Sequence, residues 1–405
     1  MEWTARYSRR ILISVMSLTF LIGTILAFHQ GPDLRYRDEQ EWSQLSANLV
    51  QLDRLTFDGI HSTTLRPPGY VWFLYLPQLF HPSAVVLRVY NMASLLVAQV
   101  FLYLLAIRIW SRFAAALAVL MSLFYPVLIY MATLLFPQTL GASMLLCILW
   151  LLVGSQSLSL RSAIAAGAIS GLLLLAIPQF APLGGALVLW LLWKRSTFRR
   201  RFVYFLLPFV LLVGGWCARN YAAVHSFVFI SCNGGANFLF GYSENSTVNS
   251  GSYTDITRYS DVGYTMPEGQ MDRYFKSIAM NWIRNHPGKA LYLYTARLAH
   301  YFDFVDAPVS GRPGATTSEK LAMYLTYGPL LVLLVARIAL AAKYPLSQTE
   351  VCLAGLYLLD AFFASMFYPR IRYRLPLDWL LIALDAGTIQ LLLTRVLKRA
   401  DVAAL

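Results

Sequence analysis

The stretch that decides the fold is residues 180–217, which read FAPLGGALVLWLLWKRSTFRRRFVYFLLPFVLLVGGWC. Two apolar runs, 180–193 and 202–217, flank five basic residues that lie between positions 194 and 201. Such runs predict membrane-spanning helices, and a basic cluster between them predicts a turn on the cytoplasmic side. This cluster is therefore the fixed point from which the rest of the topology can be counted.

The composition of the whole chain agrees with this interpretation. Of 405 residues, 58% are hydrophobic and 13% are charged, and the mean hydropathy is +0.56. A soluble domain has a much lower apolar content. The net charge of +13 comes from short Lys and Arg clusters between apolar runs, which is the positive-inside pattern. We therefore expect an all-α integral membrane protein and no nucleic-acid partner.

Counting apolar runs in both directions from the basic cluster predicts about ten crossings, with both termini in the cytoplasm. The predicted spans are 11–28, 84–107, 113–131, 134–153, 162–177, 180–193, 202–217, 321–341, 351–367 and 375–394. The stretches 69–80 and 290–305 are too short or too polar and are expected to lie at the membrane interface as short helices. If both of them crossed, the number of spans would be twelve.

The first apolar run follows Arg6, Arg9 and Arg10, as the apolar part of a signal peptide would. No small-residue cleavage site follows it at once, so we expect an uncleaved first helix.

The same count places three polar stretches on the extracytoplasmic face: 29–83, 219–319 and 368–374. Neither a repeat nor a boundary of a soluble domain is visible in the sequence. We therefore expect residues 1–405 to form one multi-pass membrane domain, in a bacterial inner or plasma membrane, with these loops meeting on one face.

The first external loop contains a cluster of acidic residues. Asp38, Glu39 and Glu41 open a predicted amphipathic helix whose apolar face starts at Trp42. One interpretation is ordinary capping and solvation, because the helix dipole favours negative charge at this end. The other is that a carboxylate near the membrane acts as the general base for a hydroxyl nucleophile.

Arg66 stands near the end of the same loop, directly before Pro67 and Pro68. The two prolines stiffen the backbone and hold the guanidinium at the membrane boundary, where it can bind a phosphate. The alternative is an anchoring arginine whose side chain reaches the lipid headgroups.

Five motifs occur in an order that resembles the GT-C membrane glycosyltransferases, in particular the group related to protein O-mannosyltransferases and lipid A aminoarabinose transferases. They are the Asp38-Glu39 helix with RPPGY at 66–70, WCARN at 216–220, GGANFLFGY at 234–242, HP at 286–287 and RYRLP at 372–376. One departure is Ile177, because many relatives carry an arginine before the proline at this point.

The resemblance implies transfer of a sugar from a polyprenyl-phosphate carrier to an acceptor hydroxyl of a glycan, lipid or protein. Transfer would take place on the extracytoplasmic face, by inverting displacement. Asp38 would activate the acceptor hydroxyl, with Glu39 beside it, and the donor phosphate would be bound by Arg66, Arg372 and Arg374.

Further expectations concern the rest of the site. Tyr70, Asn237 and Tyr373 are candidates for lining the substrate groove. The carrier chain would enter along residues 69–80 and an aromatic helix that contains Tyr292, Tyr294 and Tyr301. A divalent metal is conceivable on the acids of the first loop but is not favoured, because they lack a diagnostic spacing.

Two other classes of protein compete with the enzyme. A transporter or flippase for a lipid or amphiphile also needs many helices and a basic external patch, but it would favour internal repeats and charged or broken helices near the midplane. A non-catalytic membrane assembly subunit would not depend on the Asp38 carboxylate.

Overall fold

The computed structural model describes residues 7–153, 158–304, 306, 309 and 314–403, and these ranges contain helices and no strand. The helices are α2 (Ser8–Gln30), α3 (Arg37–Leu52), α4 (Pro68–Gln78), α5 (Ala84–Ile109), α6 (Arg112–Leu123), α7 (Pro126–Ala132), α8 (Gln138–Leu152), α9 (Leu160–Ala176), α10 (Phe180–Lys194), α11 (Ser196–Val224), α12 (Gly234–Gly241), α13 (Thr257–Gly263), α14 (Glu268–Asn285), α15 (Pro287–His300), α16 (Thr317–Ala339), the 3-10 helix η1 (Leu340–Ala342), α17 (Gln348–Ser365) and α18 (Ile371–Ala403).

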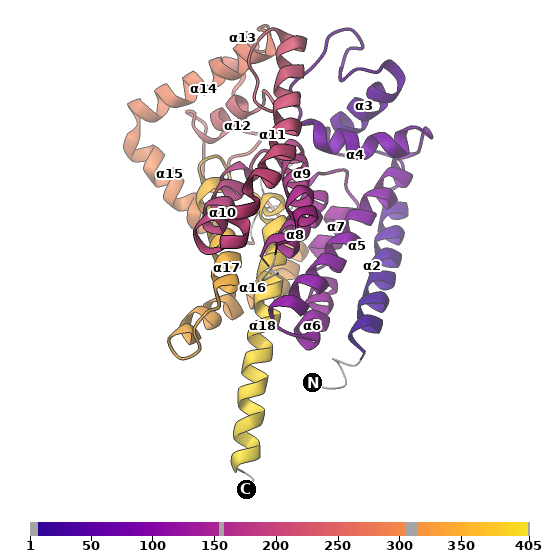
Figure 1. Ribbon diagram of the computed structural model, residues 1–405. Helices are drawn as coiled ribbons and strands as arrows, with labels where there is room; N and C mark the ends of the chain where they lie inside the picture. The colour runs from indigo at the N-terminus through magenta and orange to yellow at the C-terminus, as the bar shows by residue number, and fades with distance from the viewer. Residues whose placement is uncertain (1–6, 154–157, 305, 307–308, 310–313, 404–405) are drawn as a thin grey trace.

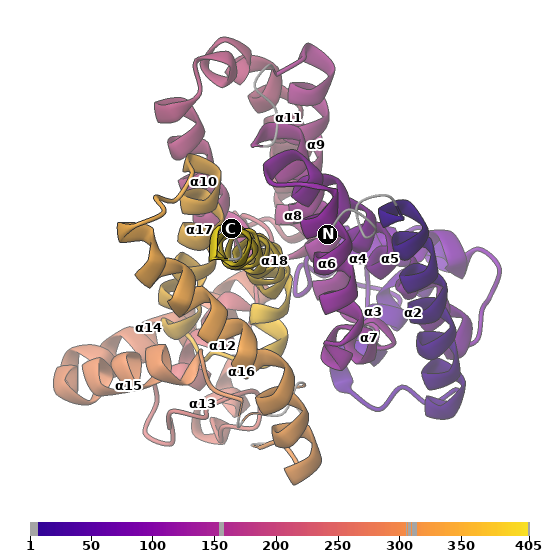
Figure 2. The same cartoon turned by 90° about the horizontal axis from the view of Figure 1, so that it is seen from below.

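The helices form a bundle with two distinct ends (Figure 1). α2 begins and α18 ends at one end of the molecule, whereas the short helices α3, α4, α13 and α14 gather at the opposite end. Seen from below, α18 runs near the middle of the bundle, between α6 and α17 (Figure 2). The helices of the predicted external loops therefore lie together, away from the ends of the chain.

Five described helices are long and apolar enough to cross a membrane: α2, α5, α11, α16 with η1, and α18. They agree with five of the ten predicted spans. The predicted span 113–131 is instead a broken pair, because α6 and α7 meet at an angle of 66° where Pro126 starts α7. The protein is an integral membrane protein by this content of apolar helices, but the predicted count of ten to twelve spans is not confirmed.

The shortfall comes from the broken pair and from four other helices, each of which is too short or too polar to count as a span. α8, α9 and α10 have 15, 17 and 15 residues. At a rise of about 1.5 Å per residue they extend roughly 22–26 Å, less than the roughly 30 Å hydrocarbon core. α17 has 18 residues and begins with a capping box closed by Glu350, which lowers its mean hydropathy. α4 and α15, from the two interfacial stretches, have only 11 and 14 residues.

The helices α9 and α11 pack closely because of a glycine. A Cβ atom at Gly167 would lie 2.8 Å from the carbonyl carbon of Phe205 and closer still to its oxygen. Gly171, one turn later, faces Phe209 and Leu212. Small residues at such contacts let two helix backbones approach in a bilayer.

We expect Gly167→Ala to destabilise the protein by on the order of 1–3 kcal/mol, because the added methyl group must push the α11 backbone away. Thermal unfolding in detergent measures the loss. Gly214→Ala on α11 is the matched control, since a Cβ there meets nothing within 4 Å. Equal melting temperatures for the two variants would contradict the close contact.

Candidate active site

The beginning of α3 is fixed by a fully buried carboxylate, Glu39. Its Oε1 accepts a hydrogen bond from the backbone N–H of Leu135 at 3.1 Å, and its Oε2 accepts one from the N–H of Tyr36 at 3.4 Å. The guanidinium of Arg88 lies 3.7 Å from the carboxylate and donates to the carbonyl of Asp33 at 2.8 Å. Burial raises the pKa of Glu39. Glu39 thus fastens the start of α3 to the segment between α7 and α8.

Asp38, the neighbouring residue, points to two arginines instead. Its Oδ1 lies 2.5 Å from Arg66 Nη2, and its Oδ2 lies 2.6 Å from Arg372 Nη1. About a fifth of the Asp38 side chain is exposed (22%). Residues that are 28 and 334 positions apart in sequence from Asp38 therefore meet on one carboxylate.

Arg66 is held by more than Asp38. Its Nε donates to Glu41 Oε2 at 2.6 Å, and its guanidinium lies over the ring of Trp42 at 5.4 Å. Its backbone is placed by the start of α4, where a Cβ at Gly69 would come 2.6 Å from the backbone nitrogen of Ala176. Because residue 69 is glycine, α4 packs directly against the end of α9. This contact fixes the position of the Arg66 backbone, three residues earlier.

Arg372 comes from the first turn of α18 and is 7% exposed. Its Nη2 donates to the hydroxyl of Tyr373 at 3.0 Å, and its guanidinium lies 4.9 Å from the rings of both Phe136 and Tyr373. The side chain is therefore held on several sides, and it presents Nη1 to Asp38.

The two arginines decide the protonation state of Asp38. Burial of the carboxylate favours its neutral form, but the guanidinium groups of Arg372 and Arg66 outweigh this effect and lower the pKa of Asp38 far below its usual value. Asp38 is therefore ionised at any physiological pH, and as long as both pairs persist it is a weak base.

Arg374 lies away from Asp38. Its guanidinium is buried and donates to the carbonyls of Tyr301 and Asp303 at 2.6 and 3.0 Å, and it lies 3.3 Å from Asp378 on the next turn of α18. Asp378 also accepts a hydrogen bond from the Tyr125 hydroxyl at 2.8 Å. Arg374 thus belongs to a polar network inside the bundle.

The three predicted groove residues lie in different surroundings. Tyr70 is fully buried, donates to Asn91 Oδ1 at 3.1 Å and packs edge-on against Trp42. Asn237 is half-buried and accepts from the Tyr368 hydroxyl at 2.9 Å. Tyr373 is half-buried beside Arg372, and its backbone carbonyl accepts from Gln179 Nε2 at 3.1 Å. Of the three, Tyr373 is the one that contacts the arginine pair.

Two carboxylates join the predicted external stretches to one another. Glu268 of α14 accepts a hydrogen bond from the backbone N–H of Thr64 at 2.6 Å and one from the Thr63 hydroxyl at 2.5 Å. Asp306 binds Arg370, two residues before Arg372, at 2.8 Å. The loops 29–83, 219–319 and 368–374 therefore contact one another around the Asp38 cluster.

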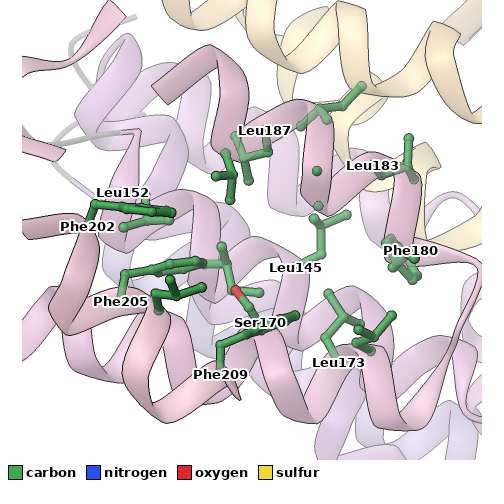
Figure 3. Close-up of a pocket in the computed structure, with 18 of the residues that line it drawn as sticks. Leu145, Leu152, Ser170, Leu173, Phe180, Leu183, Leu187, Phe202, Phe205 and Phe209 are labelled. Atoms are coloured by element: carbon green, nitrogen blue, oxygen red, sulfur yellow. The ribbon is translucent and has the colours of Figure 1, made fainter. Parts of the chain in front are cut away.

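An apolar cavity of about 340 Å³ lies between α8, α9, α10 and α11 (Figure 3). Its walls carry leucine and phenylalanine side chains, and Ser170 is the polar residue on them, as the labelled side chains in Figure 3 show. Phe180 lines the cavity, and the preceding residue, Gln179, donates to Tyr373 in the arginine cluster. The start of α10 therefore contacts both the cavity and the segment that carries Arg372.

This cavity is not the groove predicted from residues 69–80 and the aromatic helix, none of which lines it. Tyr292 is 63% exposed on α15, and Tyr301 is buried, where its hydroxyl donates to Asp360. α4 is packed against α9 through Gly69. The carrier path along residues 69–80 therefore stays a prediction, and Trp72, Leu76 and Phe80 of this stretch are exposed.

Several residues of the site escaped the sequence interpretation. Arg88 and Asp378 lie inside apolar runs, where an ionisable residue is a functional candidate by default, and this signal could have identified both. Gln179 carries no such signal, since a glutamine beside a proline is common in turns. No group of three or more His, Cys, Asp or Glu side chains within the described ranges is arranged to hold a metal ion.

We expect Glu39→Ala to destabilise the protein by about 3 kcal/mol, because it leaves Arg88 buried without its carboxylate and frees the start of α3. Glu41→Ala, the same change two residues later, removes a partly exposed ion pair and should cost less than about 1 kcal/mol. Thermal unfolding of both variants in detergent compares them. Equal losses would contradict an anchoring role that is specific to Glu39.

The comparisons with known proteins bear on both the sequence and the fold. Residues 65–215 match the protein family described as dolichyl-phosphate-mannose-protein mannosyltransferase. No curated protein matches the chain.

Solved structures show a similar fold. The oligosaccharyltransferase of Archaeoglobus fulgidus in its apo form has a TM-score of 0.56 and 14% identity, over 99% of this chain and 53% of its own. The oligosaccharyltransferase AglB from the same organism, in complex with an inhibitory peptide and a dolichol-phosphate, has a TM-score of 0.56 and 16% identity, over 98% of this chain and 52% of its own. ArnT from Cupriavidus metallidurans covers 93% and 77%, with 14% identity and a TM-score of 0.42.

This chain spans about half the length of the archaeal oligosaccharyltransferase. The match over residues 65–215 and the shared fold confirm the resemblance to the GT-C membrane glycosyltransferases that the sequence shows.

Proposed function

We propose that this protein transfers a sugar from a polyprenyl-phosphate carrier to an acceptor hydroxyl on the extracytoplasmic face of the membrane. The single observation that carries the proposal is the position of Asp38, a carboxylate bound by the guanidinium groups of Arg66 and Arg372. A base for an incoming hydroxyl and positive charge for a departing phosphate are the two groups that such a displacement needs.

The proposed chemistry follows from these groups. The oxygen of the acceptor hydroxyl attacks the anomeric carbon, and its proton passes to a carboxylate oxygen of Asp38. The bond between the anomeric carbon and the phosphate oxygen breaks, and the phosphate keeps the electron pair. Arg66 and Arg372 stabilise its growing negative charge. A single displacement of this kind inverts the configuration of the sugar.

The other candidate residues receive supporting roles in this proposal. Glu39 is a positioning residue, since both of its oxygens are engaged with backbone N–H groups. Arg374 is also a positioning residue, because it holds the start of α18 against the carbonyls of Tyr301 and Asp303. Tyr373 orients Arg372, and Asn237 lies within the neighbouring loop contacts.

The apolar cavity is the proposed site for the first isoprene units of the carrier. Its walls are mainly leucine and phenylalanine, and they include Phe180, which directly follows Gln179, the residue that contacts Tyr373. A carrier with its phosphate on the arginines would extend its chain into this cavity. The dolichol-phosphate in the AglB structure supports a carrier of this class.

The charge distribution supports the orientation in the membrane. Arg9, Arg10, Arg112 and Lys343 flank helix ends on the side where α2 begins, opposite to the helices α3 and α14 (Figure 1). By the positive-inside rule, this distribution supports cytoplasmic termini and an extracytoplasmic Asp38.

We expect Asp38→Asn to abolish sugar transfer, with a rate at least about 100-fold below that of the wild type, because an amide cannot accept the proton. Transfer is measured with a polyprenyl-phosphate sugar and purified protein in nanodiscs. The donor and the acceptor are first identified by comparing the surface glycans and glycolipids of cells with and without the protein.

The matched control is Asp53→Asn, which makes the same change at the exposed residue after the other end of α3. It should transfer at the wild-type rate. Wild-type turnover by Asp38→Asn would remove Asp38 as the base.

Filling the cavity should weaken the preference of the protein for a long-chain donor over a short one. Gly184 lines the cavity with open space around its Cβ position, so Gly184→Leu places a side chain there without a backbone clash. We expect the ratio of kcat/KM for a long-chain donor over a two-isoprene donor to fall by about tenfold, in line with the loss of buried apolar contact. Gly214→Leu, outside the cavity, should leave this ratio unchanged; an unchanged ratio in Gly184→Leu would place the chain elsewhere.

A further inference from the structure

The Asp38 carboxylate bridges two arginines in the way that a phosphate would. Each of its two oxygens accepts from a different guanidinium, at 2.5 and 2.6 Å. A phosphodiester offers the same arrangement, with two non-bridging oxygens and one negative charge. Arginine binds carboxylate and phosphate through the same donor geometry. The position between Arg66 and Arg372 is therefore an anion site that the protein fills with its own side chain.

The two guanidiniums are fixed independently of Asp38. Glu41 holds Arg66 through its Nε, and the Tyr373 hydroxyl holds Arg372 through its Nη2. Arg372 also keeps donor capacity, since its buried Nε has no partner among the described residues. Removal of Asp38 would thus leave a formed site for an anion.

Asp38 is the ligand of this site that can leave. Its side-chain hydrogen bonds within the described ranges are those to the two arginines, and 22% of its side chain is exposed. Glu41 is tied more firmly, because Arg66 contacts it through two nitrogens and Arg37 contacts its other oxygen. Glu39, on the other side of the helix, is fully buried.

We propose that the donor phosphate displaces Asp38 from Arg66 and Arg372, so that Asp38 becomes available as the base only after the donor has bound. The inference rests on the proposed function and adds the order of binding to it. The negative charge bound by the two arginines is the same before and after the exchange, because one monovalent anion replaces another on them.

The exchange has a chemical consequence. A carboxylate bound by two guanidiniums is a poor proton acceptor, and the same carboxylate without them regains the basicity of an ordinary aspartate. The acceptor hydroxyl is then activated in the ternary complex, and water is not activated at the empty site. During the transfer the proton moves from the acceptor oxygen to Asp38, and the phosphate leaves on the arginines that Asp38 gave up.

The test measures the affinity for the phosphate without any transfer step. Farnesyl phosphate is titrated by calorimetry into the wild-type protein in nanodiscs, and into Asp38→Asn, Asp38→Ala, Asp53→Asn and Arg372→Ala. We expect both Asp38 variants to bind about tenfold more tightly than the wild type, because the internal competitor is gone. Arg372→Ala should bind at least about tenfold more weakly, and Asp53→Asn should bind as the wild type does.

The outcomes separate this inference from the proposed function. Equal or weaker binding by Asp38→Asn and Asp38→Ala, with binding and sugar transfer intact in the wild type, overturns the exchange and leaves the proposed function standing. Absence of both farnesyl phosphate binding and sugar transfer in the wild type overturns the proposed function, and the exchange with it. Tighter binding in the two Asp38 variants, together with their loss of transfer, supports both.

Discussion

A charged side chain close to the hydrocarbon of a bilayer must be paired, and this constraint organises the site. Two arginines and two carboxylates, Arg66, Arg372, Asp38 and Glu41, neutralise one another at the end of the bundle where the short helices α3, α4, α13 and α14 gather. An unpaired buried charge is far more costly than a paired one. The arginines that suit a phosphate therefore need an internal anion whenever no phosphate is present, and Asp38 has that position.

The same constraint explains how the loops are held without strands or disulfides in the described ranges. Carboxylates accept hydrogen bonds from backbone N–H groups or bind arginines at each junction: Glu39 at Leu135, Glu268 at Thr64 and Asp306 at Arg370. Charge-assisted bonds of this kind are stronger than neutral ones and fix both partners in direction. Three polar stretches far apart in sequence thus converge on one cluster.

Much of the fold could be predicted from apolar runs and basic clusters, because bilayer thickness and the positive-inside rule act on composition alone. α2, α5, α11, α16 and α18 follow directly from them. The number of spans could not be predicted, because an apolar run indicates burial inside the bundle as readily as contact with lipid. α8, for example, is apolar and largely buried by neighbouring helices. The cavity also escaped prediction, since it depends on which faces of α8 to α11 remain apart.

The roles of neighbouring residues follow from helix geometry, which motif matching ignores. Successive residues of an α-helix point about 100° apart, so that adjacent acids face different surroundings, whereas residues three apart share a face. Asp38 and Glu41 accordingly both hold Arg66, and Glu39 between them is buried. Arg372 and Arg374 are about 200° apart on α18, which sends one to Asp38 and the other to Asp378. In the proposed mechanism, each of these pairs therefore supplies one residue to the chemistry and one to the scaffold.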